Sequence, residues 1–153
     1  MATVYSAQRT NTRANPTVKN KANELAGRVR IAHGTYEASS LPSGDVIEMF
    51  VLPDGARLIS GFLANDALGS STTLSVGYGA HNNAAGTAVS LSAAAYLAAT
   101  STSSAAKTTI LATLALGSGT EVDANANGMP VTVTLGGASA TGTIELTIMY
   151  ALD

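Results

Sequence analysis

The chain has 153 residues, no cysteine and a formal net charge of −2. This length favours one domain with a core large enough to fold without disulfides or metals. The lack of cysteine excludes a disulfide scaffold, a thiolate zinc site and a cysteine nucleophile. Hydrophobic residues make up 46% of the chain and charged residues only 12%, which excludes the composition of a disordered protein. No apolar run approaches the roughly 20 residues that cross a membrane, and residues 1–20 contain no apolar segment like that of a secretory signal. We therefore expect neither a membrane partner nor export by that route.

Charge is divided unevenly along the chain. Residues 1–30 hold six basic residues against one acid, a net charge of +5, whereas residues 31–153 hold two basic residues against nine acids, a net charge of −7. Residues 1 to about 23 show no helical or strand period, and Asn15-Pro16 disfavours helix at the residue before the proline. We therefore predict two parts, an extended basic arm over residues 1–24 and a β-domain over residues 25–153.

The cations of the arm can bind phosphates or an acidic protein surface. They are spread among Asn, Thr and Ala with a single aromatic residue, Tyr5, which favours a protein surface and argues against nucleic acid. The candidate contact residues are Arg9, Arg13, Lys19, Lys21, Arg28 and Arg30.

Alternation of apolar and polar residues predicts short strands through the rest of the chain. The first strand places Val29, Ile31 and His33 on one apolar face, where His33 is expected to be a core or interface side chain and not a metal ligand. The second strand follows the turn at residues 41–45 and is apolar on both faces, which predicts a central position. Turn residues at 52–56 then lead into a strand over residues 57–63.

The second half is predicted to contain one helix among its strands. Leu91 to Ala99 is alanine-rich with three-to-four spacing, which predicts a short helix. Strands are expected at residues 73–78, 109–116, 131–135 and 144–150, the last two forming a hairpin around Gly136-Gly137. Seven or eight strands separated by turns predict a mainly β fold, an antiparallel sandwich or jelly roll with one short helix and an extended N-terminal arm.

Alternation also predicts which side chains share the interior of the sandwich. These are Ile47, Met49, Val51, Leu74, Val76, Ile144, Leu146 and Ile148.

No motif gives an enzyme, so we expect a non-enzymatic protein without catalytic residues, cofactor or metal. Asp123–Gly128 reproduces the D-x-N-x-N-G opening of a calcium loop, but the twelfth position is Thr134 where the loop needs a glutamate. This segment is therefore interpreted as an Asn-Gly turn, with an ion site as the alternative. Gly137–Thr141 lacks the final glycine of a nucleophile elbow, and it connects two predicted strands.

Three segments resemble small virion structural proteins of tailed bacteriophages. They are GRVRIAHGTYE at residues 27–37, SGDVIEMFVLPDGARLISGF at residues 43–62 and TTLSVGY at residues 72–78. Within residues 27–78, about a third of the chain, the pattern is that of capsid decoration (cement) proteins. The resemblance implies a protein assembled in the host cytoplasm that binds the major capsid protein on the outer surface of the capsid. It also implies a homo-oligomer, with a trimer favoured.

An alternative is a host-recognition or carbohydrate-binding β-domain of a virion fibre or spike, because the same fold also serves lectins. A sugar site needs aromatic platforms, and this chain has no tryptophan. Its candidates are Phe62, Tyr78 and Tyr96.

Overall fold

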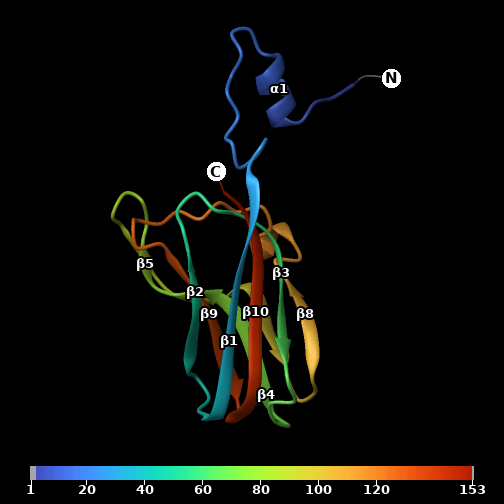
Figure 1. The fold of residues 1–153 in the computed structure, drawn as a ribbon, viewed down its shortest axis with the longest axis vertical. Coiled ribbons are helices and arrows are strands. Elements are labelled where there is room, and N and C mark those ends of the chain that lie inside the picture. Colours follow the sequence, from blue (N-terminus) through green and yellow to red (C-terminus); the bar gives the residue numbers. More distant parts are fainter. Residues whose placement is uncertain (1–2, 153) are drawn as a thin grey trace.

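Two four-stranded antiparallel sheets face each other in the computed structural model, which describes residues 3–152 (Figure 1). The first sheet has the order β1-β10-β3-β8, and the second has the order β2-β9-β4-β7. The first consists of β1 (Arg28–Leu41), β10 (Ala140–Leu152), β3 (Arg57–Asn65) and β8 (Ala106–Ile110). The second consists of β2 (Val46–Leu52), β9 (Met129–Gly137), β4 (Thr72–Tyr78) and β7 (Ser92–Ser101).

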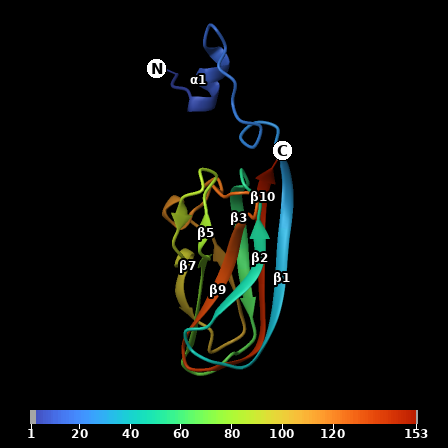
Figure 2. The same ribbon diagram turned by 90° about the vertical axis from the view of Figure 1, so that its left-hand side faces the viewer.

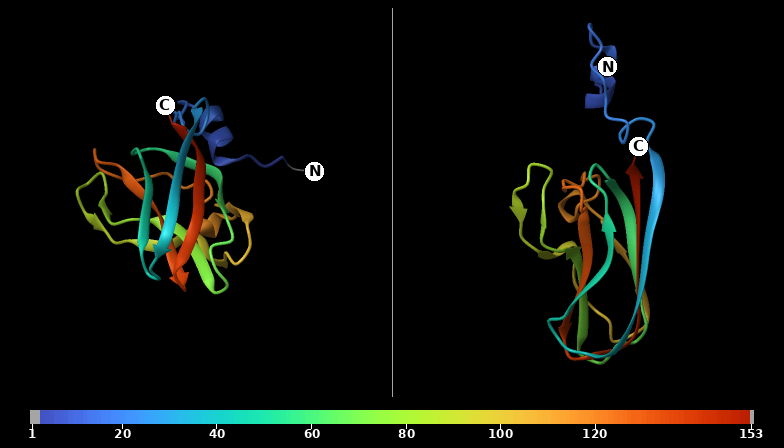
Figure 3. Two further views of the ribbon diagram at one scale, coloured as in Figure 1. Left: turned by 60° about the horizontal axis from the view of Figure 1, so that its bottom comes forward. Right: turned by 60° about the vertical axis from the view of Figure 1, so that its left-hand side comes forward.

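The connections between these strands repeatedly cross from one sheet to the other, which is how a jelly roll interlocks its two layers (Figure 3). The predicted fold class, a mainly β sandwich with one short α-helix, is confirmed. Three smaller elements complete the fold: α1 (Ala7–Arg13), a two-stranded ribbon of β5 (His81–Asn82) and β6 (Ala88–Val89), and a 3₁₀ turn at Leu114–Leu116.

The interior lies between the two sheets and contains most of the side chains predicted for it. Six of the eight are buried: Ile47, Leu74, Val76, Ile144, Leu146 and Ile148. Met49 is half-buried and packs against the core, whereas Val51 is 46% exposed, so its assignment was wrong. The reason is a bulge in β2 between Glu48 and Phe50, which reverses the alternation and turns Leu52 inward in place of Val51.

The short helix does not lie where the sequence predicted it. The segment predicted as helix forms β7, which pairs with β4, while the helix of the structure is α1 within the arm. Tyr96 of β7 is 4% exposed and its hydroxyl donates to the Met129 sulfur at 3.5 Å. The helix preference of alanine amounts to only about a few tenths of a kcal/mol per residue. Burial of the Tyr96 side chain and pairing with β4 outweigh it.

Two pairings also differ from the prediction. Residues 131–135 and 144–150 do form strands, but β9 pairs with β2 and β4, whereas β10 pairs with β1 and β3. Gly136 and Gly137 are the last residues of β9, and the short connection after them crosses to the other sheet and makes no hairpin. β2 is an edge strand and not a central one, and its apolar second face leaves Val46 44% exposed.

The apolar face predicted for the first strand points outward. Val29, Ile31 and His33 are exposed, and the opposite face of β1 carries small residues toward the interior. At Gly34 an added Cβ would lie 2.8 Å from the Met49 carbonyl oxygen, so β2 passes too close for a side chain. His33 is an exposed side chain whose ring nitrogens lie 2.9 and 3.2 Å from the hydroxyls of Thr147 and Thr35, respectively.

Candidate docking interface

The N-terminal arm lies beyond the end of the sandwich where β1 begins and β10 ends (Figure 2). Ser6 caps α1 by accepting a hydrogen bond from the Arg9 amide at 3.3 Å, and a short polar side chain is a preferred residue at that position. The helix ends at Arg13, before the Asn15-Pro16 pair that disfavours helix. No residue of α1 is buried, so the helix does not pack on the body of its own chain.

Asn20 closes the arm into a hairpin. Its side-chain nitrogen Nδ2 donates to the Gln8 carbonyl oxygen at 3.1 Å and to the Thr12 hydroxyl at 3.3 Å. Its side-chain oxygen Oδ1 accepts from the side-chain Nδ2 of Asn11 at 3.0 Å. We call residues 6–20 the arm hairpin. The sequence analysis predicted no regular structure here, because a hairpin held by polar side chains has no apolar period to reveal it.

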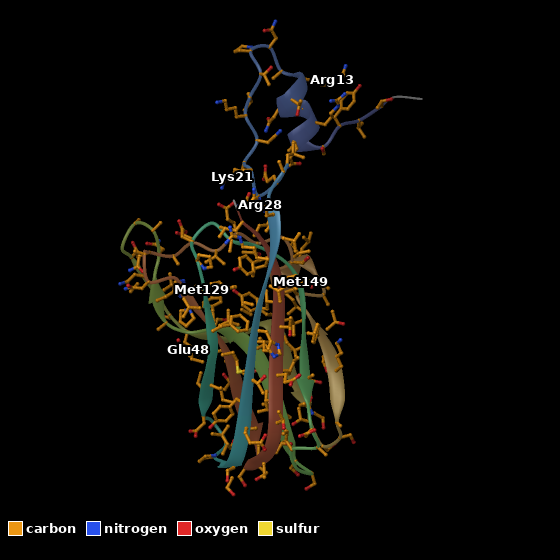
Figure 4. All side chains as sticks on the ribbon, viewed as in Figure 1. Arg13, Lys21, Arg28, Glu48, Met129 and Met149 are labelled. Atoms are coloured by element: carbon orange, nitrogen blue, oxygen red, sulfur yellow. The ribbon has the colours of Figure 1, made fainter. Side chains whose placement is uncertain are left out.

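The six candidate contact residues fall into three places along the chain, and Figure 4 labels one residue of each place, Arg13, Lys21 and Arg28. Arg9, Arg13 and Lys19 are exposed on the arm hairpin, and the Arg13 guanidinium lies 4.8 Å from the centre of the Tyr5 ring. Lys21 lies at the root of the arm, whereas Arg28 and Arg30 belong to β1. The structure therefore groups only the first three on the part of the chain that projects from the body.

An ion-pair cluster fixes the root of the arm to the body. The Lys21 ammonium donates to both carboxylate oxygens of Glu121 at 2.8 and 2.9 Å. The Arg57 guanidinium lies 3.0 Å from Glu121 and 3.4 Å from Glu24, which belongs to the arm. Asn23 adds a hydrogen bond of 2.8 Å to the Gly55 carbonyl oxygen. We call these contacts the root latch. Through them Lys21 is paired within its own chain.

The root latch was missed by the sequence analysis. Lys21 and Glu121 are 100 residues apart in the chain, and Arg57 and Glu121 are brought together by an isolated β-bridge. No local pattern marks such a pair, because the contact depends on how the strands are arranged. Only the basic character of residues 1–30 and the acidic character of the rest indicated that the two parts would attract each other.

The root latch is expected to weaken in acid. The hydrogen bond from Lys21, with help from Asn23 and the Arg57 charge, lowers the pKa of Glu121 from its ordinary value of 4.5 against the opposing effect of burial. A carboxylate with a lowered folded pKa stabilises the fold above its unfolded pKa, and this contribution is lost as the pH falls through the folded pKa.

Glu121→Gln is therefore expected to lower the free energy of unfolding at pH 7 by up to about 1 kcal/mol, because the pairs are partly exposed to solvent. Urea denaturation at neutral pH and at about pH 3 measures the difference between this variant and the parent. We expect the difference to shrink in acid. An equal difference at both pH values would show that the Glu121 charge contributes nothing.

Two polar side chains of the calcium-like loop accept hydrogen bonds from backbone amides. An Asp123 carboxylate oxygen accepts from the Ala84 amide at 2.9 Å, and the Asn125 side chain accepts from the Asn127 amide at 3.0 Å. Thr134, at the place of the missing ligand, lies within β9 and pairs with Val46 and Ser75. Among residues 3–152 no group of three or more His, Cys, Asp or Glu side chains is placed to hold a metal ion.

The aromatic side chains considered for a sugar site line or border the body without forming an open platform. Tyr78 and His81 meet edge to face at 5.6 Å, beside a cavity of about 380 Å³ that Tyr96 also lines. Tyr96 is buried, which raises the pKa of its phenol, and Phe62 is covered by the Lys107 ammonium 3.7 Å from its ring centre.

No helix within the described part of the chain is long and apolar enough to span a membrane.

Chains of similar fold occur in the solved structures of three phage capsids. No protein-family model and no curated protein matches the sequence. The capsid of Ralstonia phage GP4 contains a chain of similar structure, with a TM-score of 0.62 and 21% identity over 83% of this chain and 86% of that chain. The cyanophage Pam1 capsid asymmetric unit gives a TM-score of 0.57 and 21% identity over the same shares of the two chains.

A third similar chain belongs to the acidic stable capsid structure of Helicobacter pylori bacteriophage KHP30. Its TM-score is 0.54 at 17% identity, over 81% of this chain and 87% of that one. The resemblance to virion structural proteins that rested on residues 27–78 is thereby confirmed, and it extends over most of the chain. This chain resembles a component of phage capsids.

Proposed function

We propose that this chain is a non-enzymatic phage structural protein that decorates the capsid. It binds the shell of major capsid protein from outside, as a homo-oligomer of three copies, and stabilises the shell after assembly in the host cytoplasm. The observation that supports this most directly is a basic arm hairpin with no buried helix residue, projecting from a body whose fold occurs in three phage capsids.

The arm hairpin is proposed as the part that contacts the shell. Arg9, Arg13 and Lys19 are exposed there and would pair with acidic residues of the major capsid protein, while Arg28 and Arg30 lie next to the root. Lys21 holds the root latch, so it directs the arm and leaves the contact to the other three. The hairpin is already held by hydrogen bonds of its own, so most of its local fold exists before docking. Docking then has to order only the position of the hairpin relative to the body.

The test of this function is binding to purified phage heads, the DNA-containing or empty capsids, that lack the protein. We call these capsids heads. A variant without residues 2–20 keeps the root latch and the whole body, so we expect it to fold while its affinity for heads falls by more than about tenfold, about 1.4 kcal/mol. Heads incubated with it should lose the heat resistance that the parent protein confers. Occupancy on heads is measured by quantitative gel or by electron microscopy.

A matched control replaces residues 2–20 by a Gly/Ser segment of equal length, which keeps a flexible chain but removes the charges and the hairpin. We expect it to bind as weakly as the deletion. Unchanged occupancy of both variants would contradict docking through the arm. Failure of the parent protein to bind heads, together with binding to host surface polysaccharide, would instead favour the host-recognition alternative.

A further inference from the structure

The outer face of the β1-β10-β3-β8 sheet carries an apolar strip close to the root of the arm. Val29 is 63% exposed, Ile31 is 66% exposed and Ile59 is 42% exposed. Ile31 lies opposite Met149 on β10, and Met149 lies opposite Ser60 on β3, next to Ile59. We call Val29, Ile31, Met149 and Ile59 the outer strip; Figure 4 shows Met149 on β10, farther into the sheet than Arg28 at the root.

The outward direction of this strip is fixed by the packing of β1. The residue on the inner face of β1 has to be small where β2 passes, because an added Cβ at Gly34 would lie 2.8 Å from the Met49 carbonyl oxygen. A shift of one residue would bury Val29 and Ile31, but it would also place His33 or Thr35 at this point of closest approach. The sequence therefore holds two branched apolar side chains in water on an otherwise ordered strand, which is unfavourable unless a partner covers them.

The shape of the molecule indicates which partner covers the strip. The arm projects along the long axis from one end of the sandwich, whereas the β1-β10-β3-β8 sheet, whose outer face carries the strip, runs along a long side of the body (Figures 1 and 2). If the arm reaches the shell, the end of the body faces the shell and its sides face the neighbouring copies. Copies packed side by side through the strip would present their arms at the same end, so that several arms bind one shell together.

Charge on the same face is compatible with such a neighbour. Glu37 lies on β1 and Glu145 on β10, on one side of the face, while Lys107 lies on β8 at the opposite side. The pairings of Glu145 with Ala64 and of Ala64 with Lys107 place Glu145 and Lys107 on one surface of the sheet. Glu37 shares that surface because its partner on β10, Thr143, lies two residues from Glu145. Rotation about an axis parallel to the long axis brings the acidic side of each face beside the basic side of the next copy.

We propose that the outer strip is the surface through which copies of this chain associate, with their outer faces turned toward a common rotation axis. This rests on the homo-oligomer of the proposed function and adds the face, its residues and the direction of the arms. Closing the strip around the axis removes four apolar side chains from water and leaves the charged edges at the rim, as in stable protein interfaces.

Because the chain has no cysteine, single cysteines report the contact directly. Ile31→Cys is expected to be joined into covalent dimers by a short bifunctional maleimide, since the strips meet at the axis. Val46→Cys is the matched control, because Val46 is also an exposed apolar β-strand residue but lies on the outer face of the other sheet. We expect it to remain uncrosslinked. Equal crosslinking at both positions, or none at Ile31→Cys, would overturn the assignment.

A second measurement uses the free protein at micromolar concentration without heads. Val29→Lys/Ile31→Lys is expected to raise the dissociation constant of the oligomer at least about tenfold in sedimentation velocity, and Val46→Lys to leave it unchanged. Should the lysine variant fail to fold, Val29→Thr/Ile31→Thr keeps branched side chains in the strand and should weaken association in the same direction.

An oligomer unaffected by these changes would overturn the strip as interface. Since heads are absent, that result would leave docking through the arm standing. Conversely, an oligomer that dissociates as expected but does not bind heads would retain the interface and reject the decoration function.

Discussion

Replacing Ile148 by alanine is expected to lower the free energy of unfolding by about 2–5 kcal/mol. Ile148 is fully buried in β10, the strand between β1 and β3, where it lies opposite Ala32 on one side and Gly61 on the other. Removing three carbons here leaves a cavity, and closing it would require tightly packed backbone to move. At Gly61 the backbone is already so tightly packed that an added Cβ would lie 3.0 Å from the Ile110 side chain.

Urea denaturation of the purified protein measures this effect. Val46→Ala is the matched control, because Val46 lies on an edge strand with 44% of its surface exposed, and we expect it to cost less than about 1 kcal/mol. A loss below about 1 kcal/mol for Ile148→Ala would mean that this position does not pack in the interior between the sheets.

The strands could be predicted from the sequence because alternation is a local signal. Ile144, Leu146 and Ile148 follow the period of two and are all buried. Local signals fail where a neighbour decides the outcome. Leu91–Ala99 has the alanine content of a helix, but it lies beside Gly77, where an added Cβ would overlap the Ser92 carbonyl oxygen, so β4 and β7 approach as only strands with small residues can.

Strand partners could not be predicted because neighbours in the chain often belong to different sheets here. β9 ends at Gly137 and β10 begins at Ala140, yet each pairs with strands that lie far away in sequence. The docking arm was predictable in part for a related reason. Charge is a local property of the sequence, so Arg9, Arg13 and Lys19 could be named as contact residues. The ion pair of Lys21 could not be predicted, because its partner Glu121 is 100 residues away in the chain.

Neutralising the arm hairpin with Arg9→Gln/Arg13→Gln/Lys19→Gln is expected to lower affinity for heads by about tenfold or more. An exposed ion pair contributes about 0–1 kcal/mol, so one substitution alone should have little effect. Three in one chain remove roughly 1.5 kcal/mol, or about a factor of ten, and an oligomer multiplies the loss because each copy docks its own arm. None of the three makes an ion pair within residues 3–152, so the body should keep its stability.

Salt gives an independent measure of the same interaction. Parent occupancy should fall as sodium chloride rises, because exposed charges are screened over about 10 Å at 0.1 M, while the triple variant should lose most of this dependence. Thr3→Gln/Thr17→Gln is the control, since it introduces glutamines at exposed arm positions without changing charge. We expect it to bind heads as the parent does. If the triple variant bound with the affinity and salt dependence of the parent, the arm charges would have no part in docking, and the contact would have to lie on the uncharged surface of the arm or on the loops at the end of the sandwich.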